Sequence, residues 1–262
     1  MGEGRNTKRL MKISAVIIAR NEEEMIRGVL ESVKFCDEII VIDNDSTDNT
    51  HQIAKDRGAK VFKTEVSDFS KLRNFGMSKA SLDWLFFIDS DERVSDELRE
   101  GIKSIVSSKN PPFRVYKVSR KNYYFGNNEW PKVEKMERFF RKGSLSEWQG
   151  EIHESPVYDS KTGLLPGYLL HFTHRNLSQM LNKTIEWSDI EARKRFQGNH
   201  PKIKSWRIFR VMLTSFLGSY IGQKGWKAGA TGLVESIYQS FSAFVTYAKL
   251  WELQQKKDSQ PT

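Results

Sequence analysis

The sequence predicts an α/β protein built on a mostly parallel sheet. Apolar runs suited to buried strands begin at residues 13, 39, 59 and 84, and helical patterns of about ten residues separate them. Strands joined in this way form right-handed crossovers, with helices covering both faces of the sheet. Polar side chains follow the carboxyl ends of three of these strands, which is where open α/β sheets bind their ligands.

The elements follow in a regular order. After a buried strand over residues 13–18, Asn21 and three glutamates predict a helix start. A second strand over 39–42 ends in a polar turn at 43–48, and the helix after it ends near Gly58. A short third strand covers 59–63, a helix covers 70–80, and a fourth strand covers 84–88. After Asp96 the alternation weakens into short apolar runs, and the chain beyond about residue 176 is mostly helical.

Composition restricts the class of protein. The 262 residues, 38% of them hydrophobic, can bury a large core. The single cysteine, Cys36, excludes a disulfide framework, and a reducing compartment is expected. The run from Ile13 to Ile18 is too short for a secretion signal, so a cytoplasmic protein is predicted. No Gly-x-Gly-x-x-Gly or Walker-type loop follows a strand, which argues against dinucleotide and P-loop chemistry.

The fourth strand ends in two carboxylates, Asp89 and Asp91, separated by Ser90. Carboxylates at this spacing can converge on a hard divalent cation that carries the phosphates of a substrate. The same triplet is also common in surface turns, so the surrounding sequence has to decide between the two interpretations.

Three ordered motifs resemble family 2 glycosyltransferases: residues 16–22 (VIIARNE), residues 38–48 (EIIVIDNDSTD) and the Asp89-Ser90-Asp91 triplet. Further runs at 71–76 (KLRNFG), 138–141 (RFFR) and 152–154 (IHE), with the C-terminal helices, resemble the lipopolysaccharide-core β-glucosyltransferase branch. The resemblance covers nearly the whole chain. It implies a GT-A nucleotide-sugar fold, a metal-dependent inverting transfer and a saccharide or glycolipid acceptor.

The pattern along the chain, together with the resemblance, predicts domain limits. Residues 1–11 are expected to be flexible, 12–96 to form the nucleotide-binding half and 97–175 the acceptor half of one catalytic domain. Residues 176–254 are expected to form a helical, membrane-associating region, and 255–262 a disordered tail.

The matching positions suggest which residues bind the donor. Asp43 would hydrogen-bond the base or ribose; a helix cap shared with Ser46 is the alternative, and the two roles can coexist. Arg73 would reach the base or diphosphate, or lie on a solvated helix face. Asp89 would face the ribose or a metal-bound water, and Asp91 would bind Mg²⁺ or Mn²⁺ directly. The nucleotide pocket would also include Ala19, Asn21, Glu22 and Ser90.

One departure from the family pattern lies at Asn44-Asp45, where an acidic residue and a glycine are more usual. Asn tolerates left-handed backbone, so the turn is expected to survive. UDP-sugar remains the expected donor because the resemblance points to uracil.

Inverting transfer needs a base that takes the proton of the acceptor hydroxyl. Glu154 is the predicted base, because the family places a carboxylate in an equivalent segment, and a salt-bridged loop glutamate is the alternative. Glu151 and Asp159 are the reserves. His153 points to the other side of an extended segment and is expected to orient the loop or contact the acceptor, or simply to pack.

Other polar residues have weaker assignments. Arg138 and Arg141 bracket two phenylalanines and could clamp a diphosphate or the acceptor, since guanidinium offers paired donors. They could instead form the solvated face of a strand. His171, with His174 nearby, offers a further metal or diphosphate ligand, although a histidine pair has many structural uses.

The C-terminal part of the chain is basic and amphipathic. Residues 171–262 carry 14 Lys and Arg against 6 Asp and Glu, whereas residues 1–170 carry 28 against 27. One helix has an apolar stripe at intervals of three and four residues: Leu233, Ile237, Phe241, Phe244, Val245, Ala248 and Trp251. Glu235 makes insertion across a bilayer costly, so the helices are expected to lie on the anionic inner face of the membrane, with Trp206, Tyr220 and Trp226 near the headgroups.

Two alternatives remain for these helices: packing within the protein, or a homo-oligomer formed through them. Nucleic acid is not the expected partner, because no binding module is present and the aromatics form a helical face.

The sequence therefore predicts a glycosyltransferase that moves a hexose, expected to be glucose, from a UDP-sugar to a lipid-linked core sugar. A polyprenyl phosphate acceptor is the close alternative, and it would need no base because its phosphate oxygen is already anionic. A non-catalytic scaffold that binds nucleotide-sugar or membrane is the alternative from a different class.

Overall fold

A computed structural model describes residues 11–66, 68–150 and 154–258. The chain divides into two compact units, the first made of residues 1–121 and 134–171 and the second of residues 122–133 and 172–262. The expected nucleotide-binding strands are all present in the first unit: β1 (Ile13–Ala19), β2 (Glu38–Asn44), β3 (Lys60–Thr64) and β4 (Trp84–Asp89).

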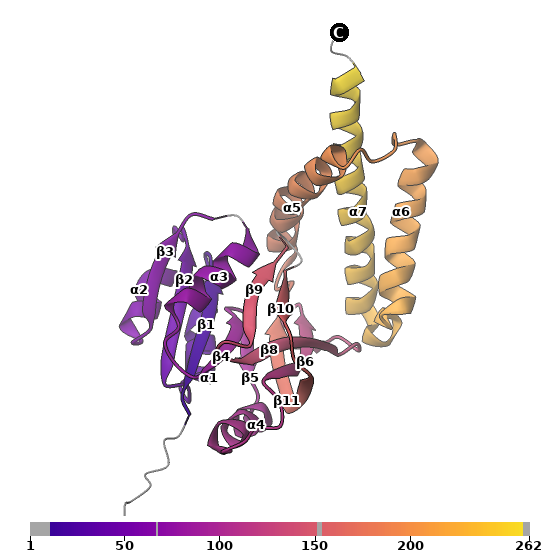
Figure 1. Ribbon diagram of the computed structural model, residues 1–262. Helices are drawn as coiled ribbons and strands as arrows, with labels where there is room; N and C mark the ends of the chain where they lie inside the picture. The colour runs from indigo at the N-terminus through magenta and orange to yellow at the C-terminus, as the bar shows by residue number, and fades with distance from the viewer. Residues whose placement is uncertain (1–10, 67, 151–153, 259–262) are drawn as a thin grey trace, which may run out of the picture. The chain divides into compact units, whose positions relative to one another are not determined.

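These four strands pair in parallel, and the later strands add antiparallel pairs. The sheet has the order β3-β2-β1-β4-β8-β6-β11-β5 in the described part of the chain (Figure 1). The added strands are β5 (Glu92–Val94), β6 (Val115–Tyr124), β8 (Glu134–Arg141) and β11 (Thr162–Phe172), and the short β7 (Asn128–Glu129) pairs with β6. The register of β1 with β2 and β4 brings Ala19, Asp43 and Asp89 to one edge.

Helices cover both faces of this sheet. On one face, α1 (Ile26–Ser32), α2 (Thr50–Asp56) and α4 (Asp96–Ser107) bury apolar side chains against the strands. On the other face lie α3 (Phe69–Lys79) and a two-stranded hairpin of β9 (Leu145–Gln149) and β10 (Ser155–Tyr158). Gly76 lets α3 approach closely, because a side chain there would collide with Val16 of β1.

The turn after β1 differs from the prediction. Asn21 does not begin a helix: its φ is +53°, its side chain accepts a hydrogen bond from the Thr47 amide at 2.8 Å, and α1 starts only at Ile26. The Asn21 side chain therefore links the loop after β1 to the loop after β2. It provides the hydrogen-bond acceptor for the backbone amide of Thr47, which is 26 residues further along the chain.

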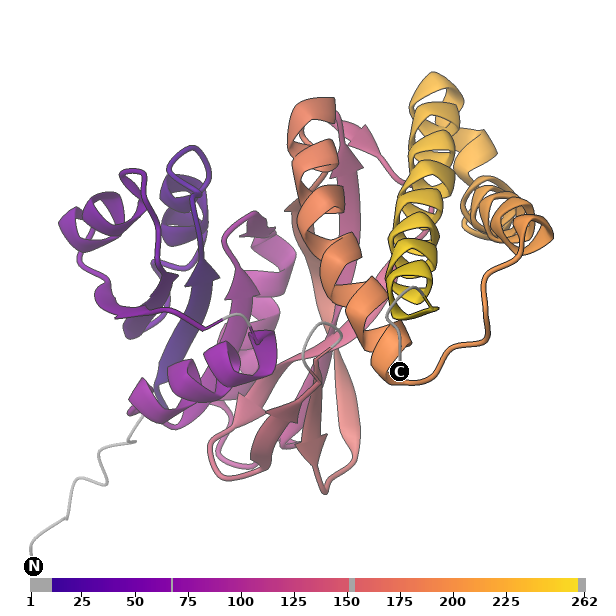
Figure 2. The same ribbon diagram turned by 90° about the horizontal axis from the view of Figure 1, so that it is seen from above.

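The second unit contains three long helices, α5 (Leu177–Gln197), α6 (Ser205–Leu217) and α7 (Gly229–Asp258), with η1 (Gly218–Gly222) and η2 (Gly225–Ala228) between the last two. In Figures 1 and 2 α7, in yellow, runs beside α5 and α6, and Ser240 of α7 donates to the Met212 carbonyl of α6 at 3.0 Å. Residues 122–133 also belong to this unit: Trp130 is buried and packs against Gly225.

Candidate active site

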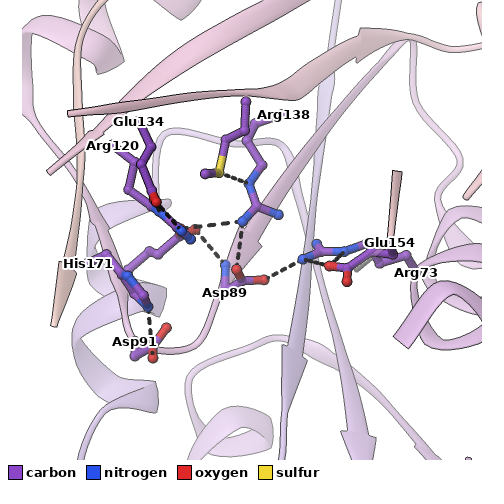
Figure 3. Close-up of polar contacts among 10 residues, drawn as sticks. Arg73, Asp89, Asp91, Arg120, Glu134, Arg138, Glu154 and His171 are labelled. Atoms are coloured by element: carbon purple, nitrogen blue, oxygen red, sulfur yellow. Dashed lines mark hydrogen bonds and ion pairs between the residues drawn. The ribbon is translucent and has the colours of Figure 1, made fainter. Parts of the chain in front are cut away.

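Asp89, the last residue of β4, is held between two arginines (Figure 3). One carboxylate oxygen, Oδ1, lies 2.9 Å from Arg73 Nη2, and the other, Oδ2, lies 2.7 Å from Arg138 Nη2. Burial would raise the pKa of this carboxyl, but Arg138 and Arg73 outweigh it and hold the pKa well below its usual range. Asp89 is therefore a fixed anion whose two oxygens already have cationic partners.

Asp91 faces a histidine from a distant strand. Its Oδ2 lies 3.3 Å from His171 Nε2 on β11, and each side chain is 15% exposed. The pairing of His171 with Glu92 in the β11–β5 ladder brings the histidine beside the turn that carries Asp91. Burial lowers the pKa of His171, but the Asp91 charge more than compensates and raises it.

The Asp91 and His171 pair is chemically suited to a divalent cation. Carboxylate oxygen and imidazole nitrogen are both ligands of Mn²⁺, and Mg²⁺ accepts one or two carboxylates with substrate phosphates. Among the described residues there is no group of three or more His, Cys, Asp or Glu placed to hold a metal. A cation here would therefore take most of its ligands from the substrate and from water.

A second group of charges supports the β4–β5 turn. Glu92 is fully buried; one of its oxygens accepts from the Asp89 amide at 2.9 Å, and the other lies 3.3 Å from Arg120 Nη1. Arg120 also pairs with Glu134 at 2.6 Å. None of these three residues was predicted as a site residue from the sequence. Glu92 could have been suspected from its place directly after Asp91. Arg120 and Glu134 lie on β6 and β8, far along the chain from Asp91, so no local pattern indicated them.

Glu154, the predicted base, also contacts Arg73. Its Oε1 accepts from Arg73 Nε at 2.9 Å and lies 2.8 Å from Nη2, so one guanidinium joins Glu154 to Asp89 (Figure 3). Arg73 is thus buried in an ion-pair network, and not on a solvated helix face. The reserve Asp159 is exposed beyond the far end of β10, and Glu151 and His153 lie outside the described residues.

The donor-side residues lie at the ends of β1, β2 and β4. Ala19 and Ser90 are buried, and the Glu22 amide donates to Thr50 Oγ1 at 2.7 Å. Asp43 is fully buried. Its Oδ1 accepts a hydrogen bond from the Ser46 amide at 3.1 Å, and its Oδ2 lies 3.0 Å from His51 Nδ1. The hydrogen bond from Ser46 closes the turn but does not cap the next helix, because α2 begins only at Thr50, with Asn49 as its N-cap residue. His51 is a neighbour that the sequence did not reveal.

The departure at Asn44-Asp45 leaves the turn intact. The residue that takes the left-handed conformation is Asp45, although Asn44 was expected to do so. Asp45 takes the left-handed conformation, with φ +54°, at the place where the family more usually has glycine. Asn44 stays in β2, and its Oδ1 accepts from the Val66 amide at 3.1 Å.

Arg138 and Arg141 do not act together. Arg138 is buried and turned towards Asp89 and Glu92, whereas Arg141 is exposed and pairs with Trp84 at the opposite end of β4. Trp84 and Asp89 are five positions apart along β4, about 16 Å at the usual rise. The expected two-arginine clamp therefore reduces to Arg138.

His174 belongs to the second unit, and its partners there give it a structural role. Its Nδ1 lies 2.8 Å from Glu235 Oε2 of α7, and its ring stacks on Tyr124 with a centroid distance of 5.1 Å. His171 and His174 are thus used differently, and only His171 adjoins Asp91.

The family model described as glycosyl transferase family 2 matches residues 14–174, which is more than half of the chain. The chain belongs to glycosyl transferase family 2. It is therefore a transferase, and its sheet and flanking helices form the GT-A fold that the sequence predicts.

Related sequences extend the match to nearly the whole chain. An uncharacterized glycosyltransferase of Rickettsia typhi is 32% identical, covering 94% of this chain and 89% of the relative. The lipopolysaccharide core biosynthesis glycosyltransferase LpsC of Rhizobium meliloti is 28% identical, covering 92% of this chain and 93% of LpsC.

Among solved structures, the chain is similar to that of TarS residues 1–349 of S. aureus in complex with UDP-GlcNAc. It is 13% identical with a TM-score of 0.48, covering 94% of this chain and 92% of that one. Glucosyl-3-phosphoglycerate synthase of Mycobacterium tuberculosis with Mn²⁺ and UDP is 25% identical with a TM-score of 0.35, covering 44% of this chain and 45% of that one.

Proposed function

We propose that this family 2 glycosyltransferase moves a hexose, glucose in the first instance, from a UDP-sugar to a saccharide of a lipid-linked lipopolysaccharide core, with inversion at the anomeric carbon. The observation that carries the proposal is that a single guanidinium, Arg73, pairs both with Asp89 at the end of β4 and with the candidate base Glu154. The similarity to LpsC over most of both chains supports the acceptor class.

In this proposal Asp91 and His171 would hold Mg²⁺ or Mn²⁺. When bound, the cation would stabilise negative charge on the departing diphosphate. Other residues of the chain hold the site in place: Arg138 and Arg73 pair with the Asp89 carboxylate, and Glu92 accepts a hydrogen bond from the Asp89 amide. The donor nucleotide would lie over Ala19, Asn21, Glu22, Asp43 and Ser90.

Glu154 would take the proton of the acceptor hydroxyl as its oxygen attacks the anomeric carbon. One carbon–oxygen bond then forms, the bond from that carbon to the diphosphate breaks, and UDP leaves. Arg73 holds Glu154 in an ion pair, and this contact has to loosen for the carboxylate to accept the proton.

The helices of the second unit support attachment to an anionic membrane surface. No helix in the described part of the chain is long and apolar enough to cross a bilayer. The buried side of α7 is partly polar, with Glu235, Ser236 and Gln254, whereas its apolar stripe is exposed at Leu233, Ile237, Phe241, Phe244 and Trp251. An apolar face turned outwards on a basic region suits the interface of the inner membrane leaflet. The same exposed stripe is also where a homo-oligomer would form.

The deciding experiment measures UDP release from UDP-glucose with and without Mn²⁺, adding a core-truncated lipopolysaccharide as acceptor. We expect metal-dependent turnover that falls at least about 100-fold in Asp91→Ala and in Glu154→Gln. The matched control is Asp159→Asn, which removes an exposed carboxylate and should leave turnover within about twofold.

Other outcomes would contradict parts of the proposal. Turnover that needs no added cation and survives Asp91→Ala would exclude the metal role. Tight UDP-glucose binding with no turnover on any envelope glycolipid would support the non-catalytic scaffold.

A second candidate acceptor is a polyprenyl phosphate, which the Arg73 and Glu154 ion pair favours. A phosphate oxygen needs no base, so a carboxylate held by arginine would not limit that reaction. Full activity of Glu154→Gln with polyprenyl phosphate, and none with lipopolysaccharide, would select this acceptor.

A further inference from the structure

The candidate base lies at the start of the second strand of a small hairpin. Glu154 directly precedes β10, and β10 pairs with β9 through Ser155 opposite Gln149 and Pro156 opposite Trp148. The position of Glu154 therefore depends on where β9 is fixed, only one or two ladder steps away.

One side chain of α3 fixes the backbone of β9. Asn74 Nδ2 donates to the Trp148 carbonyl at 2.9 Å, and the Trp148 amide donates to Asn74 Oδ1 at 2.8 Å. The amide group of Asn74 thus replaces a strand partner for Trp148, and it satisfies both polar groups of that residue's backbone.

The rest of Trp148 is also immobilised. Its buried ring lies edge-on to Phe87 and Phe140, with centroid distances of 5.1 and 5.8 Å. The Arg73 guanidinium lies over the same ring at 4.9 Å while it holds Glu154. Two adjacent residues of one helix, Arg73 and Asn74, therefore contact the hairpin at two points.

Helix α3 is packed tightly against the sheet. Gly76 lies against Val16 and Ile42, and Leu72 is buried in the same core cluster as Trp148. A small shift of β9 relative to α3 would thus move Glu154 relative to the sheet that carries Asp89.

We propose that Asn74 is a positioning residue for Glu154: it anchors the backbone of β9 to α3 so that the carboxylate meets the acceptor hydroxyl in productive geometry. The inference rests on the proposed function, in which Glu154 is the base. A misplacement of about 1 Å at a reacting group can cost about 100-fold in rate.

The test compares Asn74→Ala with Ser78→Ala, a control that removes an exposed hydroxyl from the same helix. In Asn74→Ala we expect kcat for transfer from UDP-glucose to core-truncated lipopolysaccharide to fall about 10- to 100-fold, with the KM for UDP-glucose within about twofold. Backbone hydrogen exchange in β9 and β10 should accelerate at least about tenfold, with β1 and β4 unchanged. Ser78→Ala should match the parent protein in all three measurements.

A double-variant cycle separates positioning from general structure. If Asn74 acts through Glu154, adding Asn74→Ala to Glu154→Gln should change kcat by no more than about twofold. If the losses multiply, or if hydrogen exchange of the hairpin is unchanged, the inference is overturned. Should Asn74→Ala not fold, Asn74→Asp keeps an acceptor for the Trp148 amide but sets its second oxygen against the Trp148 carbonyl, and a loss of kcat with the same pattern is expected.

Failure of the proposed function gives a different result. Full activity of Glu154→Gln would overturn the base assignment, and a hairpin that still loosens in Asn74→Ala would then leave Asn74 as an anchor without a catalytic consequence.

Discussion

Arg73 is the residue on which most of the candidate site depends. Its guanidinium pairs with Asp89 and Glu154, lies over Trp148 and is almost completely buried. Nη1 has no hydrogen-bond partner among the described residues. Removing this one cation would leave two carboxylates with fewer partners in a buried site, which costs far more than loss of a surface ion pair.

We therefore expect Arg73→Met to lower the free energy of unfolding by about 3 kcal/mol at pH 7. The matched control is Arg141→Met, which removes an exposed arginine at the end of β8, beside Trp84, and should cost less than about 0.5 kcal/mol. Urea denaturation of the two variants measures the difference, and equal stabilities would show that the ion pairs of Arg73 contribute nothing net.

At the scale of elements, one glutamate joins the amino ends of neighbouring strands. Glu38 begins β2; it contacts Ser14 of β1 and Lys60 of β3, and it accepts from the Ser81 amide shortly before β4. Burial alone would raise the pKa of Glu38, but the hydrogen bonds from Lys60, Ser14 and Ser81 lower it to about 2 from 4.5.

This pKa makes the sheet sensitive to acid. A carboxyl whose pKa is lower in the folded state contributes its full stability above the unfolded pKa of 4.5, and that contribution is lost as the pH falls towards 2. We expect Glu38→Gln to lower the free energy of unfolding by about 2 to 3 kcal/mol at pH 7, and by much less near pH 3.

Guanidinium denaturation at the two pH values tests this prediction. Lys60→Ala is the control: it removes only the exposed partner and should cost less than about 1 kcal/mol at pH 7. A penalty in Glu38→Gln that is the same at both pH values would contradict the linkage.

At the scale of the whole molecule, charge and apolar exposure coincide. Of the net charge of +9, residues 171–262 contribute +8. In the same region α6 turns Trp206, Phe209, Leu213 and Leu217 outwards, with Arg207 and Arg210 over the Trp206 ring. The spacing of three and four residues places these apolar groups on one face of the helix.

We expect the protein to bind vesicles that contain phosphatidylglycerol, and to bind phosphatidylcholine vesicles at least about tenfold more weakly. The double change Phe209→Ser and Leu213→Ser should weaken binding about tenfold or more without lowering Tm, because both side chains are exposed, Phe209 by 72%. Leu164→Ser, an exposed leucine of β11, is the control.

Flotation on a sucrose gradient measures the bound fraction. If the double variant binds like its parent but changes from an oligomer to a monomer in solution, the outward face joins copies of the chain instead of contacting lipid.

The sequence by itself determined the order of β1 to β4 with their helices, the edge of the sheet where polar residues gather, and membership of family 2. These features depend on local periodicity and on motifs within about ten residues, and such patterns can be recognised without knowledge of the rest of the fold. The sequence also determined the positions of the apolar stripe of α7.

Only the tertiary structure decided which charges are partners and which faces are buried. Arg73 and Glu154 are 81 residues apart, and Asp91 and His171 come together only because β11 pairs with β5. The direction in which α7 turns its stripe was likewise open, since burial of Glu235 depends on the partners that His174 and Gln239 provide. Side-chain partners across strands depend on register and on the order of strands in the sheet, and neither is encoded in the periodicity of a single segment.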